Sequence, residues 1–282
     1  MIVLDAHVHL WDLARRPQPW IDPETMAVLH RSFSDAELVD TCAAADVSGV
    51  VLVQVLNDRD ETQEMLATAA THPLVRGVVG WTDLADSAVA DNLHACPAHL
   101  VGIRHQALAE DDPVAWFRQP SVGRGLQQLA EADLAFDVML RWQHLPHVQP
   151  LFDSATELRV VLDHAGKAPV HEGAQGPDFP GWAAAIRQIA ARDRTWCKLS
   201  GLTTMALPGP WDAATLAPFV DVLLEAFGPQ RLIFGSDWPV SLRAGAYPEL
   251  IQTVLTLLEQ LTASEQEAIL RSNAVEAYRL IE

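Results

Sequence analysis

The sequence has few cysteines and few cationic residues. Its three cysteines, Cys42, Cys96 and Cys197, are odd in number and have no metal-ligand spacing, so we expect reduced, buried thiols. Lysine and arginine together number 19 against 37 aspartate and glutamate residues, which gives a formal net charge of −18. This acidic balance argues against nucleic acid or an anionic membrane as a partner, because either would be repelled.

The sequence also lacks a long apolar run and a glycine-rich phosphate loop. No stretch approaches the roughly 18 apolar residues of a membrane helix. Asp5 and His7 interrupt the only N-terminal apolar run, so we expect no signal peptide and a cytoplasmic protein. No phosphate loop follows the first apolar run, which disfavours a dinucleotide-binding sheet. With no repeat or linker, residues 1–282 are expected to form a single domain.

Eight short apolar runs alternate with amphipathic stretches along the chain. Continuous runs such as Val50–Gln54 suit strands that are buried on both faces of a parallel sheet. The predicted strands are Ile2–Ala6, Gly49–Val55, Val75–Trp81, Leu100–Arg104, Ala135–Leu140, Arg159–Asp163, Thr195–Leu199 and Leu232–Gly235. The helical patterns are Asp35–Asp46, Glu61–Thr71, Val122–Ala132, Trp182–Ala191 and Ala213–Phe227. This alternation predicts a (β/α)8 TIM barrel, with an open doubly wound sheet as the alternative.

Three segments fall outside this alternation. Residues 15–31 and 165–180 are irregular and follow carboxyl ends of predicted strands, where barrel active sites lie. The second is rich in glycine and proline, so we expect a mobile lid there. The tail, Tyr247–Glu282, is expected to be mostly helical and to pack outside the barrel.

The first and last predicted strands end in residues that can carry chemistry. His7 and His9 are separated by one residue, and side chains two apart in a strand point the same way. Asp237 follows the last strand. In a closed barrel these strands are neighbours, so we expect two imidazoles and a carboxylate in one pocket. A turn aspartate before Pro239 and structural histidines are the alternatives.

Other predicted strands also end in polar or aromatic side chains: Trp81, Arg104, His105, Arg141, His164, Lys198 and Trp238. His164 is a candidate third imidazole of the pocket. The two arginines could clamp a carboxylate or polarise a carbonyl, or could form salt bridges. Lys198 and His105 are candidate substrate contacts. The two indoles could stack on a substrate ring or pack in the core.

Four segments together resemble the lactonase branch of the amidohydrolase superfamily: Asp5–Trp11, Gly102–His105, Leu162–Lys167 and Ile233–Val240. The likeness spans nearly the whole chain, in order. Members of this branch include sugar lactonases acting on fuconolactone or rhamnonolactone, and pyrone-dicarboxylate lactonase. The resemblance implies a hydrolase of carbohydrate metabolism, a carboxylic ester hydrolase that opens the ring of a sugar (aldono-) lactone.

The resemblance bears on metal binding as well. In the wider superfamily, His-x-His on strand one and Asp on strand eight bind divalent metal, and two-metal members add a strand-four lysine and histidines on strands five and six. Here strand four ends in Arg104, and strand five has no histidine. The resemblance therefore implies one zinc or manganese ion on His7, His9 and Asp237, with His164 as a further ligand, or a metal-independent enzyme.

The mechanism expected from this resemblance is hydrolysis by water that Asp237 deprotonates, the proton then returning to the ring oxygen. The imidazoles of His7, His9 and His164, with Arg104 or a metal, would stabilise the carbonyl oxyanion. One alternative is a metal-dependent decarboxylase of an aromatic or unsaturated carboxylic acid, although those enzymes use a strand-five histidine. Another is a non-catalytic barrel that binds a sugar or acid. The sequence selects neither the lactone nor the oligomeric state.

Overall fold

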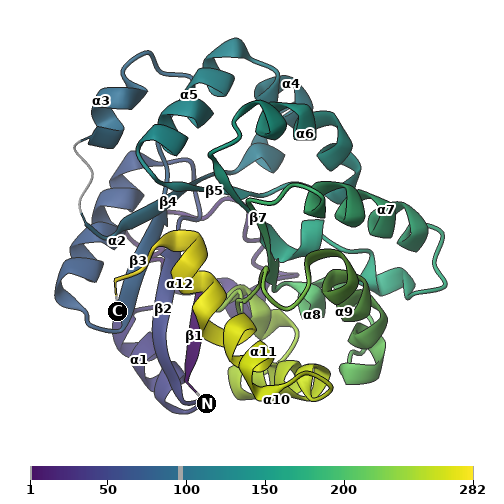
Figure 1. Ribbon diagram of the computed structural model, residues 1–282. Helices are drawn as coiled ribbons and strands as arrows, with labels where there is room; N and C mark the ends of the chain where they lie inside the picture. The colour runs from purple at the N-terminus through teal and green to yellow at the C-terminus, as the bar shows by residue number, and fades with distance from the viewer. Residues whose placement is uncertain (1, 95–97, 282) are drawn as a thin grey trace.

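Eight parallel strands form one sheet in the computed structural model, which describes residues 2–94 and 98–281 and so leaves Cys96 outside (Figure 1). The strands pair in chain order, from β1 with β2 to β7 with β8. Their bounds are β1 Val3–Val8, β2 Val47–Val53, β3 Val75–Gly80, β4 Leu100–His105, β5 Ala135–Val138, β6 Arg159–Leu162, β7 Thr195–Leu199 and β8 Leu232–Phe234. All eight predicted strands are confirmed.

The two edge strands of the sheet, β1 and β8, meet at their carboxyl ends. Val8 and Trp238 form a parallel bridge. The backbone N–H of His9 donates to the Trp238 carbonyl at 2.8 Å, and that of Asp237 donates to the His7 carbonyl at 2.9 Å. The predicted TIM barrel is therefore confirmed, and the open doubly wound sheet is excluded.

Helices surround the sheet and cover its outer, apolar face (Figure 1). The α-helices are α1 Asp35–Ala43, α2 Arg59–Thr71, α3 Val89–His94, α4 Pro113–Phe117, α5 Pro120–Glu131, α6 Leu145–Ser154, α7 Phe179–Ala190, α8 Leu202–Met205, α9 Ala213–Phe227, α10 Tyr247–Leu258, α11 Ala263–Glu267 and α12 Asn273–Tyr278. Short 3-10 turns are η1 Ala27–Leu29, η2 Ala107–Ala109, η3 Trp142–His144, η4 Asp163–Gly166, η5 Val170–Glu172 and η6 Val240–Arg243, and η7 Ala268–Ser272 is a π-helical turn.

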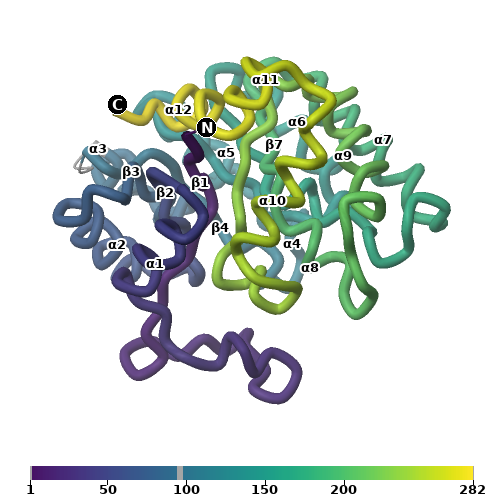
Figure 2. The backbone as a smooth tube through the Cα atoms, turned by 90° about the horizontal axis from the view of Figure 1, so that it is seen from below, coloured from purple at the N-terminus to yellow at the C-terminus, as the bar shows by residue number. Residues whose placement is uncertain are grey.

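The C-terminal tail is helical, as expected, but it does not pack wholly outside the barrel. Figure 2 shows α11 and α12 beside the N-terminus, across the amino ends of the strands. Ala274, Ala277 and Tyr278 of α12 belong to the inner apolar cluster, together with strand residues such as Val51 and Val161. The prediction for the tail was wrong on this point, because the amino end of the barrel needs an apolar cover.

The irregular segment after β1 extends away from the carboxyl ends of the strands and is the purple loop in Figure 2. Trp11 anchors it: the indole Nε1 donates to the Arg31 carbonyl at 2.7 Å, and the ring packs edge-on against Phe33. In the segment after β6, Ala165, Ala168 and Val170 are buried. Its first part is therefore packed structure, and a lid role for the remainder stays a prediction.

Two further expectations concern the thiols and membranes. Cys42 and Cys197 are free and buried, as predicted for these two. Within the described ranges, no helix has both the length and the apolarity to cross a bilayer.

Candidate active site

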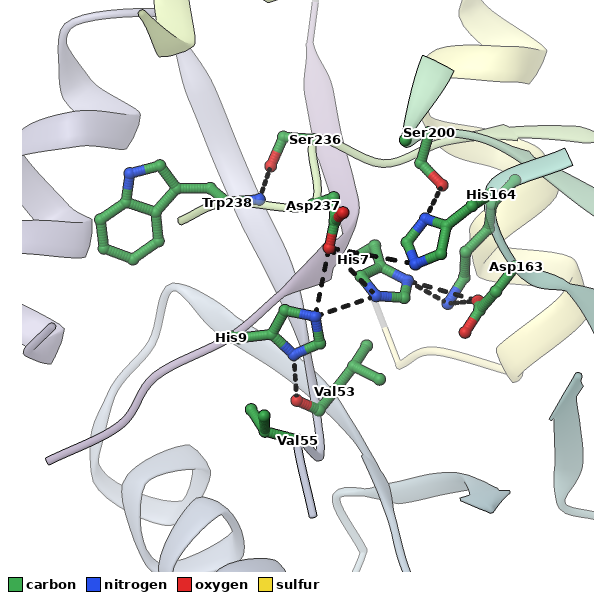
Figure 3. Close-up of polar contacts among 12 residues, drawn as sticks. His7, His9, Val53, Val55, Asp163, His164, Ser200, Ser236, Asp237 and Trp238 are labelled. Atoms are coloured by element: carbon green, nitrogen blue, oxygen red, sulfur yellow. Dashed lines mark hydrogen bonds and ion pairs between the residues drawn. The ribbon is translucent and has the colours of Figure 1, made fainter. Parts of the chain in front are cut away.

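Three imidazoles surround the carboxylate of Asp237 at the carboxyl ends of the strands (Figure 3). Asp237 Oδ1 lies 3.3 Å from His9 Nε2, 3.8 Å from His7 Nε2 and 4.0 Å from His164 Nε2. His7 comes from β1, His9 directly follows it, His164 follows β6 and Asp237 follows β8. The expected pocket residues are therefore together, and all four are buried.

The backbone at the site adopts conformations that L-residues avoid. Asp237 has a φ of 60°, and His164, Ala165 and Lys167 have φ values of 51°, 49° and 56°. Each such residue costs of the order of 1 kcal/mol or more, and such strain gathers at functional sites. The left-handed turn after β6 aims His164 at Asp237.

The Asp5–His9 segment also contains a structural residue, Asp5. Asp5 faces away from the imidazoles and accepts hydrogen bonds from Ser236 N at 2.8 Å and from the Tyr247 hydroxyl at 2.9 Å. Burial raises its pKa to about 6, against the effect of these hydrogen bonds. The pairing between β1 and β2 shifts register between Asp5 and Val8, and such irregularities redirect side chains beside active sites.

Polar partners fix the orientation of the outer two imidazoles. His9 Nδ1 lies 2.7 Å from the Val53 carbonyl, so this nitrogen carries the hydrogen and Nε2 presents a lone pair. His164 Nδ1 lies 2.9 Å from Ser200 Oγ. Both contacts leave the Nε2 atoms turned toward Asp237, as Figure 3 shows.

The pKa shifts at the site favour an ionised carboxylate at Asp237 and neutral imidazoles at His164 and His7. Burial alone would raise the pKa of Asp237, but His164, His9 and His7 together outweigh it and hold that pKa below its ordinary value. Burial lowers the pKa of His164 to about 4, and burial with the nearby Lys198 charge holds the pKa of His7 well below its usual range. Asp237 is consequently anionic and the two imidazoles are neutral near pH 7.

This donor set fits a divalent metal. His7, His9 and Asp237 present ligand atoms within 4.8 Å of one another, and the Nε2 atoms of the two histidines are 3.1 Å apart. Ligand atoms about 2.0–2.1 Å from a tetrahedral zinc ion lie roughly 3.3 Å from each other. Zinc requires neutral imidazoles and an ionised carboxylate, and His7 and Asp237 are in these states.

A charged network lies directly behind His7. Lys198 Nζ is 2.6 Å from Asp137 Oδ2 and 3.0 Å from Asp163 Oδ1, and Arg104 Nη1 is 2.9 Å from Asp163 Oδ2. None of the four side chains is more than 1% exposed. Two cations and two carboxylates balance in charge, which buried ions require.

Several expected substrate contacts have other surroundings. Lys198 and Arg104 lie within the buried network, and neither is more than 1% exposed. The Trp238 indole points away from Asp237 in Figure 3 and packs edge-on against Phe33, with 1% exposed. Lys198 thus lies inside the barrel and Trp238 lies in the core, so neither side chain is exposed for contact with a substrate in this structure.

His105 and Trp81 lie together, but apart from the imidazole cluster. The Trp81 Nε1 donates to His105 Nδ1 at 3.1 Å, and His105 Nε2 lies 2.9 Å from Glu110 Oε1. The His105 ring stacks on Trp116 with 3.8 Å between centroids. Both nitrogens of His105 are thus engaged with protein groups.

Two cations remain closer to the opening of the site. Arg141 follows β5, is exposed and forms no ion pair among the residues that the structure describes. Lys167 is partly buried, and burial lowers its pKa against the attraction of Asp237 and Asp163. Sequence reasoning did not assign Lys167; its place three residues after His164 in a glycine-containing turn was the available signal.

Hollow volume alone would not have identified this site. Two cavities of about 750 and 680 Å³ lie elsewhere: one beside α12, and one between α2 and the segment that follows β1. The convergence of titratable groups is what marks the imidazole cluster.

Comparison with known proteins agrees with this geometry. A family model described as amidohydrolase matches residues 4–280. The chain is 37% identical to an L-fucono-1,5-lactonase of Burkholderia ambifaria over 86% of this chain and 82% of that protein, and 35% identical to an L-fucono-1,5-lactonase of Burkholderia multivorans over 99% and 96%. A solved Burkholderia multivorans amidohydrolase with bound zinc superposes with a TM-score of 0.92 at 35% identity, covering all of both chains. The chain belongs to the amidohydrolase family.

Proposed function

We propose that this chain is a lactonase that hydrolyses a sugar lactone. The observation that carries the proposal is the convergence of His7, His9 and His164 on the ionised Asp237. Relatives that match most of the chain are L-fucono-1,5-lactonases, so L-fucono-1,5-lactone is the first substrate to test. The reaction adds water across the ring ester and yields the open hydroxy acid.

Asp237 is proposed to accept the proton of the attacking water. Water oxygen then bonds to the lactone carbonyl carbon, and negative charge develops on the carbonyl oxygen. When the tetrahedral intermediate collapses, the bond from carbon to ring oxygen breaks, and Asp237 returns the proton to that oxygen. The depressed pKa of Asp237 makes it a weak base, so the water must be activated by its surroundings as well.

His7, His9 and Asp237 would hold a divalent metal, with His164 as a further donor. When bound, such an ion acidifies water and polarises a carbonyl. Zinc or manganese is proposed, and a metal-independent reaction is the alternative outcome. His164 is proposed to orient water against Asp237, since its Nδ1 is engaged by Ser200.

Substrate orientation is assigned to cations near the opening. Arg141 is exposed, and Lys167 is partly buried within the electrostatic influence of Asp237. Guanidinium and ammonium groups donate to several hydroxyl or carboxylate oxygens at once, as polyhydroxylated lactones require. Arg104 is proposed to act indirectly, through its contact with His7 in the buried network. Trp81 and His105 are proposed to form the wall of the site near β3 and β4.

The decarboxylase alternative lacks a specific observation in its favour. The strand that would carry its histidine, β5, instead carries Asp137, paired with Lys198. A non-catalytic barrel is disfavoured because the relatives that match most of the chain are lactonases. A single domain over residues 1–282, a cytoplasmic location and the absence of nucleic-acid or membrane partners remain predictions.

The test is hydrolysis of a panel of aldonolactones and pyrone dicarboxylates by purified protein. Hydrolysis is monitored as acid release with a pH indicator. Metal content is measured first, and the assay is repeated after chelation. Turnover of at least one sugar lactone supports the proposal, and turnover of none rejects it. Activity lost on chelation and restored by zinc or manganese supports the metal role, whereas full activity without metal assigns the reaction to Asp237 and the imidazoles alone.

A further inference from the structure

His7 lies between two cations and between two acceptors. Its Nδ1 is 2.9 Å from Lys198 Nζ and 3.3 Å from Asp163 Oδ1. Its Nε2 is 3.2 Å from Arg104 Nη1 and 3.1 Å from His9 Nε2. The ring is fully buried, and a neutral imidazole carries a single N–H. That hydrogen can therefore lie on Nδ1, toward Asp163, or on Nε2, toward His9.

The orientation of His9 makes its Nε2 an acceptor. Its Nδ1 is held by the Val53 carbonyl at 2.7 Å, and a carbonyl can only accept. The Nε2 lone pair therefore faces His7. A hydrogen on His7 Nε2 has a partner there in the absence of metal.

Asp137 and Tyr278 fix the orientation of Lys198 from the side opposite His7. Its ammonium group donates to Asp137 Oδ2 at 2.6 Å and faces His7 Nδ1 at 2.9 Å. Asp163 Oδ1 lies 3.0 Å away as an ion-pair partner, without hydrogen-bond geometry. Asp137 is itself held by the Tyr278 hydroxyl of α12, which lies 2.9 Å from both carboxylate oxygens. Asp137 thus holds the Lys198 ammonium group beside His7 Nδ1.

We propose that Lys198 is a positioning residue that holds His7 as its Nε2–H tautomer and so weakens metal binding at His7, His9 and Asp237. An ammonium donor at Nδ1 requires a lone pair on that nitrogen. Metal binding instead requires the lone pair on Nε2, which moves the hydrogen to Nδ1, where it faces the ammonium. Arg104 favours the opposite tautomer, but its contact is longer, and its Nη1 also donates to Asp163.

The first test measures the tautomer in the wild-type protein without metal. Nitrogen-15 chemical shifts of labelled histidine distinguish a bare ring nitrogen from a protonated one, and the His7 signals are assigned by their loss in His7→Gln. The hydrogen is expected on Nε2. A hydrogen on Nδ1 would overturn the proposal. Because no zinc is present, this result does not depend on the proposed metal-binding role.

The second test measures zinc affinity by calorimetry. In the double variant Lys198→Met, Asp137→Asn, one buried charge of each sign is removed, while Asp163 keeps Arg104. Zinc is expected to bind at least about tenfold more tightly than to wild type, the scale on which groups behind a metal ligand act. Equal or weaker binding would contradict the proposal. Tyr278→Phe is the matched control, since it loosens the same network but leaves Lys198 on His7, and its zinc affinity is expected to match wild type.

Discussion

His9 and Asp237 lie 3.3 Å apart, Nε2 to Oδ1, although they are near opposite ends of the chain. The backbone contacts that close β8 onto β1 bring them together, since Asp237 N bonds the His7 carbonyl and His9 N bonds the Trp238 carbonyl. The site therefore exists only when the barrel is closed. Zinc affinity and catalysis are expected to respond to anything that shifts these two strands.

Zinc binding is the first consequence. Wild-type protein is expected to bind one zinc ion per chain, and His9→Ala is expected to weaken binding by on the order of 100-fold, because one of three donors is lost. Calorimetry and metal analysis of dialysed protein measure this. His171→Ala, in an exposed histidine, is the control and should bind as wild type does. Equal affinity of His9→Ala and wild type would remove His9 from the ligand set.

Gly235 is expected to be required for the position of His7. A Cβ added at residue 235 would lie 2.7 Å from the His7 Cβ, closer than two carbons can pack, so Gly235→Ala must push the first strand away. Activity is expected to fall about 10- to 100-fold, the scale for a misplacement of about 1 Å. Gly123→Ala is the control, since its Cβ would meet only the flexible end of Leu151. Steady-state kinetics of the two variants decide, and unchanged activity in Gly235→Ala contradicts the claim.

Glu61 is expected to make stability depend on pH. It is 4% exposed and accepts from Val55 N at 2.9 Å and Leu56 N at 2.8 Å, and burial raises its pKa to about 7. The folded state then holds the proton more tightly than the unfolded state. This stabilisation is present below the unfolded pKa and is lost as pH rises toward 7, by at most about 3 kcal/mol.

The Glu61 effect is measured as a difference between variants, because Asp5 and Asp137 titrate in the same range. Glu61→Gln places an amide N–H against a backbone N–H and is expected to cost about 1–3 kcal/mol at pH 5. The difference in the free energy of unfolding between Glu61→Gln and wild type, measured with urea, should narrow by pH 8, because Glu61 of the wild type is then ionised while buried. A gap that stays constant or widens would show that Glu61 does not titrate there. Glu259→Gln, at an exposed position, should show no pH-dependent gap.

The strands and the imidazole pocket could be predicted because the evidence is local. Apolar runs of strand length mark the sheet, and polar residues placed where those runs stop mark one end of a barrel. His7, His9, His164 and Asp237 follow from that rule alone. Closure of the barrel then supplies the proximity that no single segment contains.

The sequence did not predict whether other side chains at the strand ends face the pocket or the protein interior. Lys198 lies within an apolar strand, and a lysine there can be buried only with partners from other strands, here Asp137 and Asp163. Trp238 follows Asp237 in sequence but turns into the core against Phe33. The entry of Tyr278 into the barrel depends on how α12 docks, which the apolar pattern of the tail does not specify.

The most direct test of the account is sugar-lactone hydrolysis by wild type and by Asp237→Asn, compared at saturating substrate. The substitution is nearly isosteric, so fold and substrate binding should survive, while kcat should fall by about 10²- to 10⁴-fold because the proton acceptor is gone. Asp40→Asn, on the exposed face of α1, is the matched control and should retain full activity. If Asp237→Asn turns over the lactone at the wild-type rate, Asp237 is not the base and the proposed mechanism is wrong.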